Sequence, residues 1–156
     1  MHSLLLALTT AIVYGLPASQ LNKAQRVLNT AARFVCCATR FSHITRLMYE
    51  LHWLPLKQRI HFKILLFAFK TIHGIATTYI QKLVSLKSQG AYNLPSSGGI
   101  LLALPTFRTK VTLGDRSFQV AAPKLWYALP RELRDIPNLH TFKSNLKTYL
   151  SKFAYG

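Results

Sequence analysis

The segment between Pro55 and Gly74 constrains the fold of this 156-residue chain more than any other part of it. Proline is favoured in the first turn of a helix and glycine just after the last, so residues 55–73 are predicted to form one long helix. Apolar side chains cover most of its circumference, namely Leu56, Ile60, Ile64, Leu65, Phe67, Phe69 and Ile72. A helix that is apolar on most sides is a buried one, so we expect this segment inside the fold.

Cations interrupt this apolar surface along one narrow stripe. Arg59, Lys63 and Lys70 fall within roughly 40° of one another on a helical projection. The stripe has two interpretations. An internal helix can open along it onto a groove that holds a polyanion, or the stripe is simply the solvent side of a core helix. The sequence leaves both open.

The segment 19–37 is predicted to be an amphipathic helix, because its apolar residues recur at spacings of three and four. The apolar side consists of Leu21, Ala24, Leu28, Ala31 and Val35. The polar side consists of Lys23, Arg26, Thr30 and Arg33. We expect the apolar side to face the core and the polar side to face solvent or a partner.

The remaining segments also favour helices. Helices are predicted over residues 43–51, 77–85, 115–128 and 138–153, with Pro123 kinking or dividing the third of these. Trp126 is predicted to lie in the core, with a platform for base stacking as the alternative. Residues 87–99 have the composition of a linker, and 100–104 with 110–113 are compatible with two short strands. The expected fold class is mainly α, with five to seven helices and at most a short two-stranded β-ribbon near residues 100–113.

The chain carries far more positive than negative charge. It has 20 Lys and Arg residues against 4 Asp and Glu, which gives a formal net charge of +16, and no acid lies between Glu50 and Asp115. Such a field attracts polyanions, with RNA and DNA the usual cellular ones. An anionic membrane surface and an acidic partner subunit are the alternatives.

The residues needed for catalysis or metal binding are scattered. The four carboxylates do not cluster, and His43, His52 and His61 have no Cys or carboxylate at ligand spacing. We therefore expect no enzyme activity, no cofactor, no metal and no small-molecule substrate. The adjacent Cys36 and Cys37 cannot close a loop with each other and lack the spacing of a zinc site, so we interpret them as small buried residues of a reducing compartment. The apolar run 4–13 is too short to span a bilayer and does not look like a signal peptide.

Short sequence blocks follow one another along most of the chain after residue 14. In the first half they are YGLP (14–17), LNKAQRVLNTAAR (21–33), HIT (43–45), LHWLP (51–55), QRI (58–60) and FKILL (62–66). In the second half they are GDRSF (114–118), VAAP (120–123), LW (125–126), LP (129–130) and FK (142–143). In order and approximate spacing, these blocks resemble the region that follows the polymerase core in LINE-type (non-LTR) retrotransposon reverse transcriptases.

The resemblance implies a truncated C-terminal piece of such an enzyme, with its thumb and post-polymerase part. The expected division is an apolar segment 1–18 from the end of the polymerase core, a thumb-like helical module 19–86, a loop or linker 87–110 and a C-terminal helical module 111–156. The family's polymerase site holds two magnesium ions with aspartates that include an adjacent Asp-Asp pair. This chain has no such pair, so the polymerase activity does not carry over.

The resemblance does imply binding to the phosphate backbone of RNA or of an RNA/DNA hybrid. The residues expected to contact phosphates are Lys23, Arg26, Arg33, Arg59, Lys63 and Lys70. The polymerase core that this chain lacks is a further candidate partner, and the family indicates the nucleus or the cytoplasm rather than secretion. Two alternatives stay open: a decayed retroelement fragment with no independent function, and a peripheral binder of anionic membranes, although a membrane is not the partner we expect.

Overall fold

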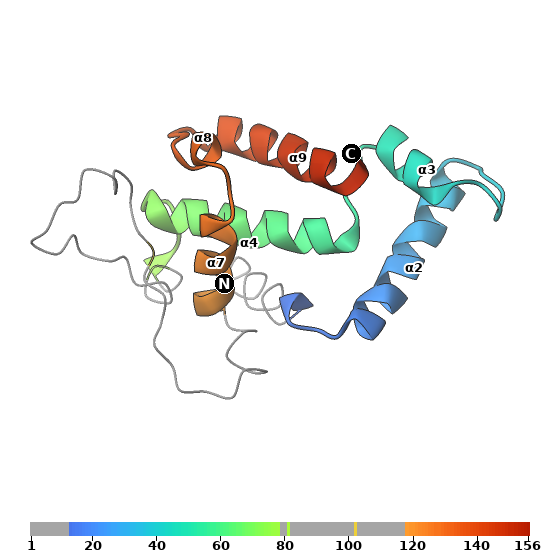
Figure 1. Cartoon of the computed structure of the whole chain (residues 1–156), viewed down its shortest axis with the longest axis horizontal. Coiled ribbons are helices and arrows are strands. Elements are labelled where there is room, and N and C mark those ends of the chain that lie inside the picture. The colour runs from blue at the N-terminus through green and yellow to red at the C-terminus, as the bar shows by residue number, and fades with distance from the viewer. Residues whose placement is uncertain (1–12, 79–80, 82–101, 103–117) are drawn as a thin grey trace, which may run out of the picture.

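The computed structural model of the chain describes residues 13–78, 81, 102 and 118–156 (Figure 1). Its helices within these residues are α2 (Ala18–Val35), α3 (Ile44–Glu50), α4 (Leu56–Ile72), α7 (Phe118–Tyr127), α8 (Arg131–Arg134) and α9 (Leu139–Tyr155). The prediction of a mainly α fold is confirmed. Apart from Leu102, the predicted β-ribbon lies outside the described residues, as do the linker 87–99 and most of the predicted helix 77–85.

Helix α4 lies at the centre of the fold, as its apolar circumference predicts. Helix α9 runs antiparallel to it, and α7 crosses it (Figure 1). The ring of Phe69 stacks on Phe142 of α9 at 4.3 Å between centroids, and Phe67 meets Phe118 of α7 edge to face. These side chains are buried, and burial of each contributes roughly 1.5–3 kcal/mol.

Trp126 is also part of this core. Its side chain is 3% exposed, and its ring centroid lies 5.8 Å from that of Phe142. The core prediction for Trp126 is confirmed. Helices from both predicted modules, 19–86 and 111–156, contribute to the same hydrophobic cluster through α4, α7 and α9. The proposed boundaries between the modules remain a prediction.

Helix α2 is rotated relative to the orientation that its apolar pattern predicts. Ala32 is its buried residue, while Val35 is 55% exposed. The reason is a polar contact: the backbone N–H of Leu56 donates to Gln25 Oε1 at 2.7 Å, and Gln25 Nε2 donates to Asn29 Oδ1. Proline at position 55 offers no side-chain cap to the first turn of α4, so Gln25 turns inward to satisfy one of its backbone donors. The predicted inward face of this helix is therefore partly wrong.

The ends of α2, α3 and α4 share one backbone motif. After each helix a residue adopts the left-handed conformation: Cys37 (φ 47°), His52 (φ 53°) and Gly74 (φ 68°). Each is followed by an N–H that donates back into the helix, from Ala38, Trp53 and Ile75 to the carbonyls of Arg33, Met48 and Lys70. This is the Schellman arrangement, which favours glycine. The stop predicted at Gly74 is confirmed, whereas Cys37 and His52 take the same conformation with a side chain. The prediction that both cysteines are buried is wrong: Cys36 is half-buried and Cys37 is exposed, because they lie where α2 ends.

The C-terminal helices differ from the prediction in details. Helix α7 is continuous through the buried Pro123, and the short α8 that begins after Pro130 was not predicted. Helix α9 begins where Asn138 Oδ1 accepts hydrogen bonds from the N–H groups of His140 and Thr141. On its apolar face Phe142, Leu146 and Leu150 are buried, whereas Phe153 is 74% exposed.

Candidate nucleic-acid interface

An open groove of about 990 Å³ lies between α3 and the C-terminal half of α9. In Figure 1 the C-terminus of the chain lies next to α3. Helix α3 and its flanking turns contribute His43, Thr45, Arg46, Tyr49, His52 and Leu54. Helix α9 and the end of the chain contribute Lys147, Thr148, Ser151, Lys152, Tyr155 and Gly156. The α9 residues recur at spacings of three and four, which places them on one face of the helix.

The electrostatics of this groove favour an anionic ligand. Arg46, Lys147 and Lys152 line it, and among the described residues no carboxylate side chain does. Arg46 Nε lies 2.9 Å from Glu50 Oε1, but both side chains are more than half exposed, so this pair is weak. Lys152 lies in the last turn of α9, where it also offsets the partial negative charge of the terminal carbonyls. Lys147 lies further from that end, so the carbonyls offset its charge less.

The wall of the groove is fixed by contacts between distant parts of the chain. The Tyr155 hydroxyl donates to the backbone carbonyl of Trp53. Arg59 Nε donates to the carbonyl oxygen of Leu54 at 2.9 Å, and its guanidinium carbon lies 5.3 Å from the centroid of the Trp53 ring. Burial raises the pKa of Tyr155, an effect that the nearby Arg59 charge partly opposes. The turn before α4 is thereby joined to the last turn of α9.

The three residues on α4 that were predicted to contact phosphates differ in their exposure and in their contacts. Lys63 is exposed, and Lys70 is half-buried in the last turn, where a cation suits the helix dipole. Arg59 is half-buried and engaged with Trp53 and Leu54, at the back of the groove rather than in it. None of these three lines the groove between α3 and α9.

The residues predicted on α2 also lie away from the groove. Lys23 and Arg26 are exposed, and Arg33 is half-buried in the last turn. The Nε atom of Arg33 is buried, and within the described part of the chain no hydrogen-bond partner reaches it. In the last turn of α2, the charge of Arg33 suits the C-terminal end of the helix dipole. Its contact with a phosphate stays a prediction.

The groove was not predicted as a site because its walls come from segments about 100 residues apart in the sequence. The helices themselves were predicted, and Lys147 and Lys152 are exposed on the last one. Their proximity to Arg46 depends on how α3 docks against α9, which periodicity does not specify. The sequence does contain one indication of this site: Lys147, Lys152 and Tyr155 share one face of the last helix.

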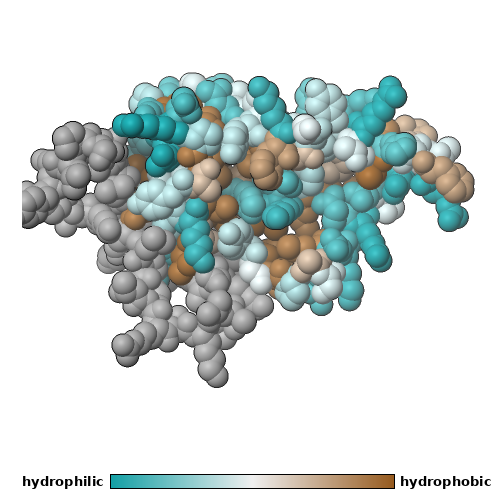
Figure 2. Space-filling model, in the orientation of Figure 1, coloured by the Kyte–Doolittle hydropathy of each residue, from teal (hydrophilic) through white to brown (hydrophobic). Residues whose placement is uncertain are grey.

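A second, smaller hollow lies between α2 and the start of α4. It has a volume of about 350 Å³ and is lined by Tyr14, Leu21, Lys57, Ile60 and His61. Figure 2 shows hydrophobic side chains in the space between these helices. Burial, and to a lesser extent the charge of Lys57, lower the pKa of His61, whose ring lies 5.6 Å from that of Tyr14. This hollow is mostly apolar and carries little charge for a polyanion.

The described residues were also searched for other kinds of site. Within them, no group of three or more His, Cys, Asp or Glu side chains is arranged to hold a metal ion. None of the described helices combines the length and the apolar character needed to cross a membrane. Comparison of the chain with protein-family models gave no match, and comparisons with curated proteins and with solved structures gave none either.

Proposed function

We propose that this chain is a non-catalytic module that grips the phosphate backbone of RNA, or of an RNA/DNA hybrid, in the groove between α3 and α9. The observation that carries the proposal is the meeting of Arg46, Lys147 and Lys152 around one open groove. Contacts to phosphate require Lys and Arg on a rigid frame and no base-specific groups. The hydroxyl of Thr45, which lines the same groove, is an additional donor to phosphate oxygens.

The rest of the chain supports this choice of ligand. A net charge of +16 raises the rate at which any polyanion reaches the surface, and exposed Lys23, Arg26 and Lys63 extend the positive field beyond the groove. The resemblance to the post-polymerase region of LINE-type reverse transcriptases agrees with the proposal, because that region implies a hold on template and element RNA.

The test compares two lysines one turn apart on the same helix. Lys147 lines the groove, whereas Lys143, also exposed on α9, does not. We expect Lys147→Gln to lower the affinity for a labelled structured RNA by about fivefold, and Lys143→Gln, which removes the same charge, to change it by less than about twofold. Fluorescence anisotropy in a fixed salt concentration is the measurement.

Other outcomes separate the proposal from its rivals. If Lys143→Gln and Lys147→Gln weaken binding equally, the groove has no special role and binding depends on total charge. A purified chain without a cooperative thermal transition would favour the decayed fragment instead, because a working site needs a stable frame.

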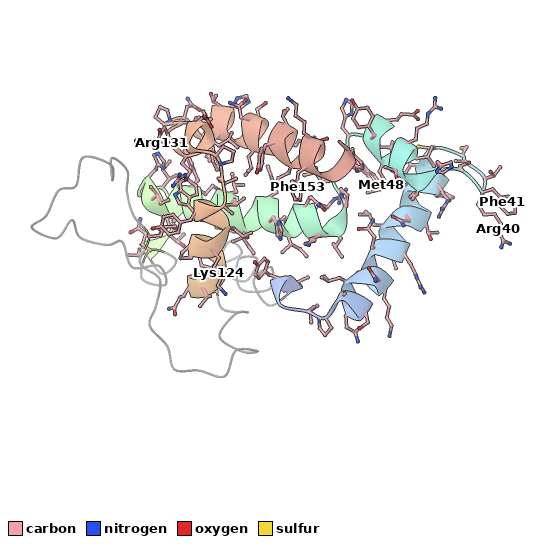
Figure 3. All side chains as sticks on the ribbon, in the orientation of Figure 1. Arg40, Phe41, Met48, Lys124, Arg131 and Phe153 are labelled. Carbon is pink, nitrogen blue, oxygen red and sulfur yellow. The ribbon has the colours of Figure 1, made fainter. Side chains whose placement is uncertain are left out.

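A second candidate function is docking to an anionic membrane through α2. Val27 and Phe34 are 71% and 84% exposed on one side of this helix, next to Lys23 and Arg26. Phe41, 85% exposed, lies in the turn that follows, beside Arg40 (Figure 3). Basic residues beside exposed aromatic and aliphatic side chains are typical of helices that lie in the membrane interface. Sedimentation with phosphatidylserine vesicles, lost in Phe34→Gln, would favour this candidate.

A further inference from the structure

Tyr49 is an aromatic side chain that the backbone-binding function does not require. It lies on the α3 wall of the groove and is 59% exposed. A ring so exposed contributes little to the hydrophobic core, and it is not among the side chains of the core cluster. Its position beside Arg46 instead gives a flat apolar surface next to the cations of the groove.

A second aromatic ring packs against that of Tyr49 and restricts its motion. The centroid of the Tyr49 ring lies 5.8 Å from that of Tyr155, with the two ring planes at 83°. This edge-to-face arrangement is a preferred one for aromatic pairs. Tyr155 is itself fixed, because its hydroxyl donates to the Trp53 carbonyl. The ring of His52 is tied to the same turn, with Nδ1 3.0 Å from the Tyr49 carbonyl oxygen. An exposed ring with restricted motion loses little entropy when a ligand stacks on it.

We propose that the groove takes single-stranded nucleic acid, with one unpaired base stacked on Tyr49 and the flanking phosphates on Arg46, Lys147 and Lys152. This inference rests on the proposed function and adds the strandedness of the ligand to it. Proteins that bind single strands without sequence preference combine a basic groove with aromatic rings on which bases stack. The bases of a duplex are already paired and stacked, so their faces are closed to Tyr49.

The test uses a 12-nucleotide oligouridylate and a 12-base-pair RNA duplex as probes. We expect Tyr49→Leu to lower the affinity for the single strand by about tenfold and to leave the affinity for the duplex unchanged. Tyr49→Phe keeps the ring and is expected to bind the single strand like the original chain. An equal loss for both probes, or no loss for the single strand, overturns the stacking role.

The same experiment distinguishes failure of this inference from failure of the proposed function. If Lys147→Gln with Lys152→Gln weakens binding while Tyr49→Leu does not, the groove still binds phosphates but stacks no base on Tyr49. If neither variant changes affinity, both proposals are wrong.

A measurement on the unmodified chain covers the case in which Tyr49→Leu does not fold. A single-stranded RNA that carries 4-thiouridine is crosslinked by light and the adduct is located by mass spectrometry. An adduct on Tyr49 supports the proposal, and adducts confined to residues outside the groove overturn it.

Discussion

The hydroxyl of Tyr155 donates a hydrogen bond to the backbone carbonyl of Trp53, which lies 102 residues earlier in the chain. This bond joins the end of α9 to the turn before α4 at one end of the groove. We expect Tyr155→Phe to lower the free energy of unfolding by about 1 kcal/mol, because the partly buried carbonyl loses its donor. Urea unfolding followed by circular dichroism measures this, and an unchanged midpoint would show that the bond contributes nothing.

Arg59 has a structural role that a lysine cannot fill. Its Nε donates to the Leu54 carbonyl while its guanidinium carbon lies over the Trp53 ring, 5.3 Å from the centroid. A lysine keeps the charge but has neither the flat guanidinium nor its fork of donors. We therefore expect Arg59→Lys to lower the free energy of unfolding by about 1 kcal/mol. Lys63→Arg, on the exposed side of the same helix, is the control and is expected to be neutral. Equal stability of Arg59→Lys and the original chain would contradict this role.

Cys37 occupies a backbone conformation that favours glycine. Its φ of 47° lies in the left-handed region, and its side chain is exposed. We expect Cys37→Gly to raise the free energy of unfolding by about 0.5–1 kcal/mol, because relief of the steric cost exceeds the added entropy of the unfolded chain.

The neighbouring Cys36 is a matched control for this substitution. Its φ is −86°, so glycine brings no relief there and Cys36→Gly is expected to be destabilising. Thermal unfolding of both variants is the measurement. A loss of stability in Cys37→Gly as large as in Cys36→Gly would disprove the argument from backbone conformation.

His61 makes the stability of the fold depend on pH. Its pKa is lowered in the folded chain, first by burial and then by Lys57, so the unfolded chain binds the proton more readily. The contribution of His61 is fully present above the ordinary histidine pKa of about 6.5 and is lost as the pH falls below that value. We expect the urea concentration at the unfolding midpoint to decrease when the pH is lowered from 7.5 to 5. In His61→Gln this decrease is expected to be smaller. Identical pH profiles for the two proteins would rule out His61 as the cause.

Much of the helical framework could be predicted from the sequence, because the spacing of apolar residues in α4 and the start and stop signals at Pro55 and Gly74 are local. What the sequence did not predict depends on contacts between helices. The inward turn of Gln25 follows from the unsatisfied N–H of Leu56, a feature of α4 that the pattern of α2 does not contain. The basic groove depends on α3 meeting α9, so the residues predicted to bind phosphate were chosen by helix face alone.

The most direct test of the central claim is the salt dependence of RNA binding by the original chain and by the Lys147→Gln, Lys152→Gln variant. Each phosphate contact with a single strand adds about 0.7 to the slope of log affinity against log salt concentration. If these two lysines neutralise phosphates in the groove, the slope for oligouridylate becomes flatter by about 1.4 in the variant. Parallel lines for the two proteins would mean that neither lysine touches a phosphate, and the proposed groove would be wrong.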